Sequence, residues 1–563
     1  MGAKRLVRKN ALIRKLHAVE TLGSVTFICS DKTGTLTQNK MKVVEVFESA
    51  SGQQPDDELH GLAIAMALNQ DVSVEKEILK GDPTEIAIVE YIREKYGDHK
   101  KIAERFPRVE ELPFDSDRKL MTTIHRFNNR YLVFSKGAIE SLTGIVNKGE
   151  DAINQKATEM SRNGIRVIAF GFKYIDSIPQ PLKYEEIEKD LSYLGLVGMI
   201  DPPREEARSA IGECNTAGIN TVMITGDHRE TAAAIAKELG ILSEGQLVVD
   251  GNELKDLTDQ KLIENIEQIR VYARVSPEQK LKIVKALQAK EHFVSMTGDG
   301  VNDAPSLKTA NIGVAMGITG TDVSKESADM ILLDDNFATI VKAVREGRRI
   351  YDNIRRFVKY IMTCNSAEIW TIFMAPLIGL PIPLLPVHIL WINLVTDGLP
   401  GLALSAEKAE HDIMKRPPRK TNESLFAGGT GIHILWVGIL MAAITLGIQA
   451  WTYHSGNENW QTMVFTVLSL AQLAHVFAIR SDNEFIYRKG FFSNRPLLVA
   501  VVITFFLQMA VIYLPQANKL LKTNPLNMEE LLICIGLSIF LFHAVEAEKL
   551  IKKWNRKKSG AQQ

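Results

Sequence analysis

The sequence predicts an α/β domain with a parallel sheet, an α+β domain inserted into it, and an all-α domain of six membrane helices. Three observations predict this order. Short β-branched runs end near aspartates in the first half, and a long stretch of mixed helical and strand-like pattern separates the first run from the others. Long apolar runs fill the chain beyond Arg356. At 563 residues the chain is too long for one core, since domains average roughly 150 residues.

Composition limits the partners of the chain. Its 67 basic and 67 acidic residues cancel, so no basic field favours a nucleic-acid partner. The four cysteines lack paired spacing, which predicts a reducing environment and no disulfide framework. They are Cys29, Cys214, Cys364 and Cys534. A basic amphipathic segment, and no secretory signal, opens the sequence.

The first strand-like run, Val25 to Cys29, is followed by Asp31 in the stretch ICSDKTGTLT. Open parallel sheets carry their reactive groups at the carboxyl ends of their strands, so Asp31 is a candidate nucleophile. The alternative is an N-cap aspartate that only begins a helix. Phosphate and magnesium partners elsewhere in the chain would decide between the two interpretations.

Two further apolar runs supply such partners. TVMITGDH (221–228) and HFVSMTGDGVNDAPSL (292–307) both end in polar residues, and ARVSPEQKLKIV puts a lysine on a predicted helix. The residues are Thr225, Gly226, Asp227, Asp299, Asn302, Asp303 and Lys280. Magnesium carboxylates, a hydroxyl and a cation around one aspartate are the groups that phosphoryl transfer requires. The insert between Met41 and about Ser192 is predicted to be a separate domain.

Six apolar stretches reach the ~20 residues that a membrane helix needs. We expect them at 357–380, 386–404, 428–451, 461–479, 497–515 and 528–547. The loop 405–424, the segment after 479 and the basic tail 548–563 are rich in Lys and Arg, which predicts that they are cytosolic. An even number of spans puts both chain ends in the cytosol with Asp31.

Two of these spans carry residues that a lipid-facing helix should not have. Asn365 and Glu368 share one helix face, as do Asn393, Thr396 and Asp397. Gln472 adds a further amide in a third span, where a hydrogen bond between helices is the alternative role. Buried carboxylates in a membrane are costly and mark ion sites, and oxygen ligands favour a hard cation such as calcium, sodium or magnesium. The alternative is polar contact between helices.

The motifs DKTGTLT, DPPR (201–204), TGD and TGDGVNDAP, in this order, resemble the phosphorylation domain of P-type ATPases, a branch of the haloacid-dehalogenase fold. Similarity to calcium pumps runs from Lys4 to about Arg419. The resemblance implies that Asp31 forms an aspartyl-phosphate, that Lys280 and Thr225 contact phosphate, and that Mg²⁺ is bound by Asp31, Thr33 and Asp299. Thr33 stands where related phosphatases have an acid, so the acyl-phosphate should persist.

The resemblance also implies the domain limits. The phosphorylation domain would comprise 1–40 and 195–345, the nucleotide-binding domain 41–194, and the stalk with its membrane helix 346–380. KGDPTE, LPFDSDRKLM, FSKGAIE and GIRVIAFGF resemble the nucleotide-binding domain of the family. By this match ATP would contact Glu85, Phe114, Lys136, Arg166, Thr33, Gly226, Asp227, Arg274 and Asn302. Phe114 would stack on adenine, although a phenylalanine is also a common core residue, and Ser116 replaces an arginine of the pattern.

CNSAEIW and WINLVTDGLP resemble the fifth and sixth helices of calcium pumps of the sarco/endoplasmic-reticulum type. The resemblance implies that calcium is the transported ion and that it binds Asn365, Glu368, Asn393, Thr396, Asp397 and Gln472. The reticulum type has a glutamate at the position of Gln472 and the plasma-membrane type a glutamine. The choice between one and two bound calcium ions therefore stays open.

A complete pump of this family has an actuator domain with a TGES loop and four more membrane helices, and neither TGES nor a PEGL-like segment occurs here. We expect ATP binding and phosphorylation at Asp31, with transport requiring a complementary amino-terminal chain. The alternative is a non-transporting, nucleotide-binding membrane protein that regulates a partner pump. The composition and the absence of targeting signals favour a prokaryotic plasma membrane, with the catalytic domains in the cytosol.

Overall fold

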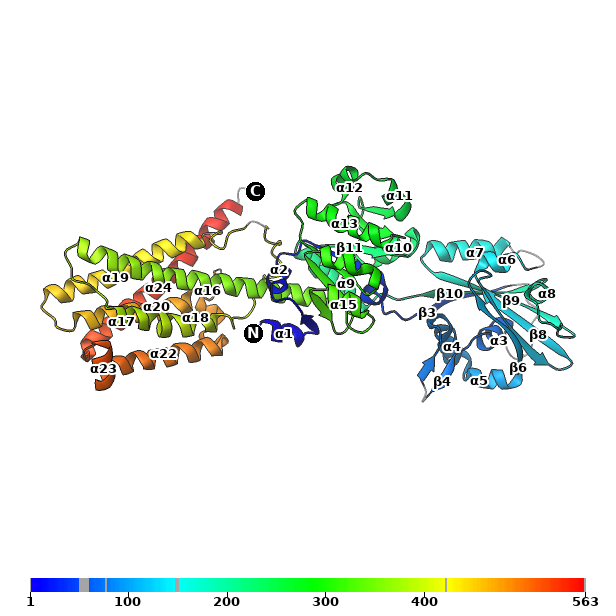
Figure 1. The fold of residues 1–563 in the computed structure, drawn as a ribbon, viewed down its shortest axis with the longest axis horizontal. Coiled ribbons are helices and arrows are strands. Elements are labelled where there is room, and N and C mark those ends of the chain that lie inside the picture. The colour runs from blue at the N-terminus through cyan, green and yellow to red at the C-terminus, as the bar shows by residue number, and fades with distance from the viewer. Residues whose placement is uncertain are drawn as a thin grey trace. The chain divides into compact units, whose positions relative to one another are not determined.

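The computed structural model describes residues 2–49, 60–75, 78–146, 151–420, 423–482 and 484–560. Its contacts divide the chain into two compact units. One unit comprises Asn10–Arg14 and Val25–Val341, and it contains the two large sheets in Figure 1. The other comprises Met1–Lys9, Lys15–Ser24 and Lys342–Gln563, and it is helical.

The first sheet has eight strands in the order β1-β16-β15-β14-β2-β11-β13-β12. Their bounds are β1 (Ala11–Ile13), β16 (Met330–Leu332), β15 (Ile312–Met316), β14 (Val294–Gly298), β2 (Phe27–Asp31), β11 (Asn220–Thr225), β13 (Ile269–Ala273) and β12 (Leu247–Asp250). All pairs are parallel except β1 with β16. Because both faces of the central strands are covered, their residues are buried almost throughout, including several serines and threonines.

Helices follow the strands of this sheet in the chain. The longer ones are α9 (Glu205–Thr216), α10 (Arg229–Leu239) and α13 (Pro277–Ala289), and the shorter ones are α11 (Gly251–Asp256), α12 (Asp259–Asn265), α14 (Ala304–Thr309), α15 (Asp322–Ser327) and the 3₁₀ turn η2 (Val301–Asp303). Apolar residues of the sheet and of α13 form one core, which includes Phe27, Ile224 and Ile283. This core fixes the position of the central strand β2.

The second sheet is antiparallel and has the order β3-β10-β9-β8-β7-β6. Its strands are β3 (Lys42–Glu48), β10 (Ser192–Ile200), β9 (Arg166–Ile175), β8 (Arg130–Gly137), β7 (Leu120–Phe127) and β6 (Arg108–Asp115). The associated helices are α3 (Gly61–Leu68), α4 (Pro83–Tyr96), α5 (His99–Arg105), α6 (Ile139–Thr143), α7 (Asp151–Arg162) and α8 (Tyr184–Ile187), and β4 (Ser73–Glu75) pairs with β5 (Ile78–Lys80). Strand β10 continues in this sheet to Ile200, so the inserted sheet extends beyond the predicted limit at residue 194.

The helical unit contains α16 (Phe337–Leu377, which begins in the first unit), α17 (Pro386–Trp391), the π-helical turn η3 (Ile392–Asp397), α18 (Gly398–Leu404), α19 (Thr430–His454), α20 (Trp460–Ala478), α22 (Arg495–Tyr513) and α24 (Met528–Gly560). Shorter elements are α1 (Gly2–Val7), α2 (Ala18–Leu22), α21 (Ile486–Lys489), η4 (Phe491–Ser493) and α23 (Pro515–Leu521). Helix α20 is the central one, because 83% of the residues in its most apolar stretch are buried. The corresponding share in the other long apolar helices is 33–39%.

Within the described residues, five helices are long and apolar enough to cross a membrane. They are Pro386–Leu404, Thr430–His454, Trp460–Ala478, Arg495–Tyr513 and Met528–Trp554. Each overlaps a predicted span, and 386–404 matches its prediction at both ends. The remaining predicted span, 357–380, lies mostly in α16, where Asn365 and Glu368 interrupt the apolar sequence. The count of six spans therefore stays a prediction.

Candidate functional site

Three parallel strands bring their carboxyl ends to one edge of the eight-stranded sheet. Strand β2 lies between β14 and β11, and Asp31 is its last residue. The register pairs Asp31 with Ile224, the residue before Thr225, and pairs Cys29 with Met296. The loops that follow these strands therefore begin next to the Asp31 carboxylate, at the edge where open α/β sheets bind ligands.

Lys280 links two carboxylates at this edge. Its Nζ lies 2.8 Å from Asp31 Oδ2 and 2.7 Å from Asp303 Oδ1. Burial of the ammonium lowers the pKa of Lys280, but the charges of Asp31 and Asp303 outweigh burial and raise it above the ordinary lysine value. Lys280 is thus a fixed positive charge beside the predicted nucleophile.

Asp303 holds both Lys280 and the loop after β14. Its Oδ2 accepts hydrogen bonds from the backbone N–H groups of Asp299 (3.2 Å) and Gly300 (3.1 Å). A side chain at Gly298 would place Cβ only 2.5 Å from Asp303 Cβ, so glycine is required for this close approach. These contacts are those of a residue that positions Lys280 and the loop after β14.

Asp299 is the carboxylate that fits a magnesium ion. Burial raises its pKa, and the nearby charges of Asp31 and Asp303 raise it further, so a divalent cation would relieve an unfavourable negative cluster. Among the described residues, no three His, Cys, Asp or Glu side chains form a metal-binding group. Mg²⁺ usually takes one or two carboxylates and completes its shell with water and phosphate oxygens, so Asp31 and Asp299 suit it.

The loop after Asp31 is held by contacts that sequence analysis did not predict. Lys32 forms a 2.6 Å ion pair with Asp227 from the loop after β11. Asp201 Oδ2 accepts a 2.5 Å hydrogen bond from Thr37, and Arg204 donates to the carbonyl oxygens of Gly34 and Thr37, both at 3.0 Å. The DPPR motif at 201–204 was the available signal, since it supplies both Asp201 and Arg204.

In the described part of the chain, the other side chains of this unit that were predicted to contact phosphate or ATP form no hydrogen bond with the side chain of Asp31 or Lys280. Thr225 is buried, and its Oγ1 accepts a 3.1 Å hydrogen bond from the N–H of Asp227. Arg274 lies against the exposed imidazole of His228. Thr33 and Asn302 are exposed. Their predicted ATP contacts, and that of Gly226, stay predictions.

A second polar site occupies one end of the antiparallel sheet. Lys136, on β8, is buried, and its Nζ lies 2.5 Å from Glu85 Oε1 on α4 and 2.6 Å from the carbonyl oxygen of Asn69. Burial lowers the pKa of Lys136 although Glu85 opposes this effect. Glu85 also accepts a 2.9 Å hydrogen bond from the N–H of Asp71. The predicted pair of ATP residues is therefore joined directly.

Phe114 and Arg166 lie at the same end of this sheet. Strand register places Leu120 opposite Gly137 and Gly137 opposite Ala169, so β6 ends and β9 begins at this end. Phe114 is 64% exposed, so its ring is available to a ligand and is not a core residue. Ser116 lies in the turn that follows.

The helical unit contains a third polar cluster, around Glu368 of α16. Its Oε2 accepts from Asn393 Nδ2 of η3 at 3.4 Å, and its Oε1 accepts from Gln472 Nε2 of α20 at 3.2 Å. Asn365 lies one turn before Glu368 on α16. Residues from three segments thus meet. Sequence spacing predicted that the polar residues within α16, and those within η3, share one helix face.

This cluster leaves several buried oxygen atoms without hydrogen-bond partners among the described residues. They are Oγ1 of Thr396, both carboxylate oxygens of Asp397, and Oε1 of Gln472. Glu368 and Asp397 are only 5% and 1% exposed. Unpartnered buried oxygens are costly, and a hard cation would satisfy them. The π-helical geometry of η3 was not predictable from spacing, and such turns are frequent at functional sites.

The sequence of this chain is similar to those of known proteins of one family. Residues 60–206 match the family described as P-type ATPase, cytoplasmic domain N, and residues 381–551 match cation transporting ATPase, C-terminus. A calcium-transporting ATPase of Bacillus cereus is 44% identical over 98% of this chain. The chain belongs to the P-type cation-transporting ATPase family.

Other P-type relatives agree. A calcium-transporting ATPase of Bacillus subtilis is 43% identical over 96% of this chain, and a cation-transporting ATPase of Synechocystis is 36% identical over 95%. The chain spans about two thirds of the length of these relatives, with 66% for the Bacillus cereus protein and 65% for the other two. Together with the five apolar helices, family membership identifies this P-type chain as a multi-pass membrane protein.

Proposed function

We propose that this chain performs the phosphoryl-transfer and ion-binding steps of ATP-driven calcium transport. The observation that carries the proposal is the bridge from Lys280 to Asp31 and Asp303 at the end of β2. We further infer a haloacid-dehalogenase-like fold for the eight-stranded unit and a reticulum-like pump type. The motifs DKTGTLT and WINLVTDGLP support these two inferences.

In the proposed step, a carboxylate oxygen of Asp31 attacks the γ-phosphorus of ATP. The new bond joins Asp31 Oδ to phosphorus, the bond to the β,γ-bridging oxygen breaks, and ADP leaves with that electron pair. Lys280 neutralises charge on the transferring group, and Asp303 keeps the lysine in place. Mg²⁺ would supply charge neutralisation at the phosphate oxygens, with Asp31, Thr33 and Asp299 as its protein ligands.

ATP would be held by the end of the antiparallel sheet described above. Phe114 presents an exposed ring for adenine, while Lys136 and Glu85 form the polar wall. Arg166, Arg274, Gly226, Asp227 and Asn302 are proposed as further contacts, on the strength of the motifs that contain them. The exposed ring and the buried lysine together suit a nucleotide, which has an aromatic base and an anionic tail.

Calcium is the proposed cargo. Two Bacillus relatives are named calcium-transporting ATPases, and the unpartnered oxygens of Thr396, Asp397 and Gln472 suit a hard cation. Glu368, Asn365 and Asn393 would complete the ligand set. The membrane is proposed to be the plasma membrane, with the two sheets on the cytosolic side.

An acid-quench experiment tests the phosphoryl-transfer step. Purified full chain in detergent is incubated with γ-phosphate-labelled ATP and Mg²⁺, with and without calcium, and then denatured in acid. We expect a hydroxylamine-sensitive label on the wild type and none on Asp31→Asn. Asp256→Asn is the matched control, because Asp256 is an exposed aspartate at the end of α11 and lies outside the site.

The two variants separate the outcomes. Label on Asp31→Asn equal to that on wild type would contradict Asp31 as the acceptor. Loss of label in both variants would indicate damage to the fold instead. Label that is independent of calcium would leave the aspartyl-phosphate intact and contradict the proposed cargo.

A further inference from the structure

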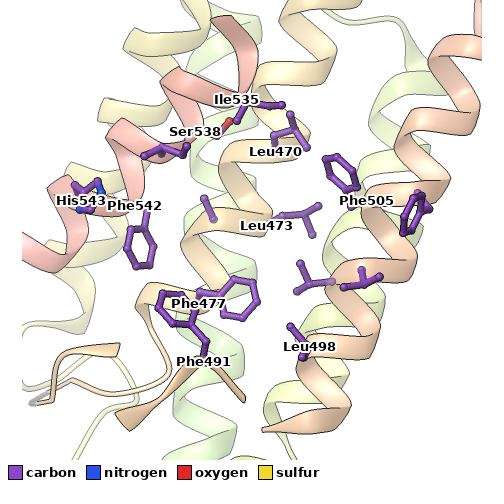
Figure 2. A pocket seen from close by; sticks show the side chains of 15 residues that line it. Leu470, Leu473, Phe477, Phe491, Leu498, Phe505, Ile535, Ser538, Phe542 and His543 are labelled. Atoms are coloured by element: carbon purple, nitrogen blue, oxygen red, sulfur yellow. The ribbon is translucent and has the colours of Figure 1, made fainter. Parts of the chain in front are cut away.

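An apolar cavity lies among the membrane helices, away from the cluster around Glu368. Its volume is about 650 Å³, and it is lined by residues of α20, α22, α24 and η4. Figure 2 shows Leu473 and Phe477 of α20 with Phe542 of α24 and Phe505 of α22 around it. The cavity is open to its surroundings on one side, so it is a groove between the helices, and its size is that of a ligand-sized space.

The wall of the cavity is almost entirely apolar. Ser538 and His543 are its polar residues, and Ser538 Oγ already donates to the carbonyl oxygen of Cys534 at 2.8 Å. An apolar groove that opens between helices long enough to cross a membrane favours a hydrocarbon occupant. His543 is exposed, as expected for a residue at the entrance of the cavity.

Large side chains on the two outer helices argue against a partner helix. The wall uses Val501, Phe505 and Phe506 on α22 and Ile539 and Phe542 on α24. Contacts between membrane helices are enriched in small residues, which let the backbones approach closely, and none of these wall residues is small. A flexible chain, in contrast, follows an uneven wall of aromatic and branched residues.

A basic residue lies on α22 one turn before the first residue of that helix in the wall. Arg495 precedes Leu498 and Val502 by three and seven residues, so it continues the same face of α22 beyond the wall. Arg495 and Arg488 are exposed. On α24, Glu546 lies beyond Phe542, but its carboxylate accepts a 2.7 Å hydrogen bond from Lys549. The positive-inside rule places this end of α22 at the cytosolic surface, where anionic lipids attract basic residues.

From these observations we propose a specific site for an anionic phospholipid. One acyl chain fills the cavity between α20, α22 and α24, and the phosphate group lies by Arg495 at its cytosolic end. The site is in the helical unit, so the proposal does not depend on phosphoryl transfer at Asp31. It adds a structural lipid to the ligands expected for this chain.

Native mass spectrometry of the purified full chain tests the site. The protein is equilibrated with equal amounts of phosphatidylglycerol and phosphatidylcholine that have identical acyl chains. We expect one phosphatidylglycerol to stay bound to wild type, and Val501→Trp, which fills the cavity, to lower its occupancy at least tenfold. Val499→Trp is the matched control, because Val499 is on the same helix, is 55% exposed and does not line the cavity.

Arg495→Gln tests the headgroup. We expect it to abolish the preference for phosphatidylglycerol while one lipid of either kind still binds. Thermal midpoints identify a misfolded variant, and Ser538→Leu replaces Val501→Trp if the latter fails to fold. Three results would overturn the proposal. They are equal phosphatidylglycerol occupancy in Val501→Trp and Val499→Trp, equal retention of both lipids by wild type, and a bound membrane peptide in place of lipid. Unchanged phosphorylation in these variants would separate its failure from that of the proposed function.

Discussion

At the residue scale, the site at Asp31 depends on one close approach and one bridge. Gly298 lets Asp303 come near β14, Asp303 holds Lys280, and Lys280 contacts Asp31. Each contact depends on the preceding one, so a change at the end of β14 should alter the charge beside the nucleophile. Asp303 and Gly298 would act without touching the substrate.

Gly298→Ala tests this dependence. The added methyl group would lie 2.5 Å from Asp303 Cβ, and we expect at least tenfold less phosphorylated enzyme in the acid-quench assay. Gly212→Ala is the control, because nothing lies within 4 Å of the position that its added methyl group would take in α9, and alanine should stabilise that helix by up to ~1 kcal/mol. Equal phosphorylation of the two variants would show that Asp303 is not required where it lies.

Asp299 provides a pH and metal test. Its raised pKa means that the folded protein holds this proton more tightly than the unfolded chain, so the charged form costs stability at neutral pH. Asp299→Asn should therefore raise the thermal midpoint in the absence of Mg²⁺, because the variant removes this cost. This gain should disappear as the pH falls below ~4, the ordinary aspartate value. Mg²⁺ should raise the midpoint of wild type alone, and an equal rise in the variant would exclude Asp299 as a ligand.

Phe114 tests the nucleotide site. Its ring is exposed, so Phe114→Ala should leave the thermal midpoint unchanged while ATP binding, followed by calorimetry, weakens roughly tenfold or more, as stacking on a base is worth ~1–3 kcal/mol. Tyr96→Ala, which removes another exposed ring from the same domain, should bind ATP normally. Similar losses in both variants would argue against stacking at Phe114.

At the element scale, sequence predicted the strands well and the loops poorly. The runs that end at Asp31 and Thr225 are buried on both sides, as central parallel strands are, so the sequence pattern predicted both strands. Because the two strands are parallel neighbours, their carboxyl ends lie at the same edge of the sheet. The pair Lys32–Asp227 joins loops from different strands, and no local pattern encodes such a contact. The π-helical turn at 392–397 and the lipid-sized cavity likewise depend on packing between distant segments.

The start of α13 gives a prediction at this scale. Ser276 caps the helix that carries Lys280, because its Oγ accepts a 3.4 Å hydrogen bond from the N–H of Gln279. In return, the N–H of Ser276 donates to Gln279 Oε1 at 2.8 Å. Ser276→Ala should lower stability by about 0.5–2 kcal/mol and reduce phosphorylation. Thr258→Ala removes the cap of α12 and should cost similar stability with phosphorylation intact. Normal phosphorylation in both variants would show that the cap does not position Lys280.

At the scale of the whole molecule, the two proposed chemical sites belong to different units. Asp31 lies in the unit of sheets and Glu368 in the helical unit, and α16 runs continuously from Phe337 in the first unit to Leu377 in the second. A pump must make phosphorylation depend on bound cation, which requires coupling between the units. A single long helix is a suitable element to transmit it.

Calcium dependence tests this coupling. Asp397→Asn keeps the size of the side chain but removes the charge of a carboxylate that has no hydrogen-bond partner in the described part of the chain. We therefore expect phosphorylation to lose its response to calcium while ATP binding stays normal. Thr504→Val is the control, since Thr504 has another buried, unpartnered oxygen but lies on α22, outside the Glu368 cluster. A normal calcium response in Asp397→Asn would contradict the proposed ligand set.

The pairing of Lys42 with Ile200 has a practical consequence. The inserted domain leaves and re-enters the rest of the chain on neighbouring antiparallel strands, so its two ends lie side by side. Domains with adjacent ends tolerate excision and transplantation. Residues 42–200 could therefore be cloned as a separate cassette, and the gap in the parent chain closed with a short linker, so that each half of the catalytic machinery becomes accessible to separate engineering.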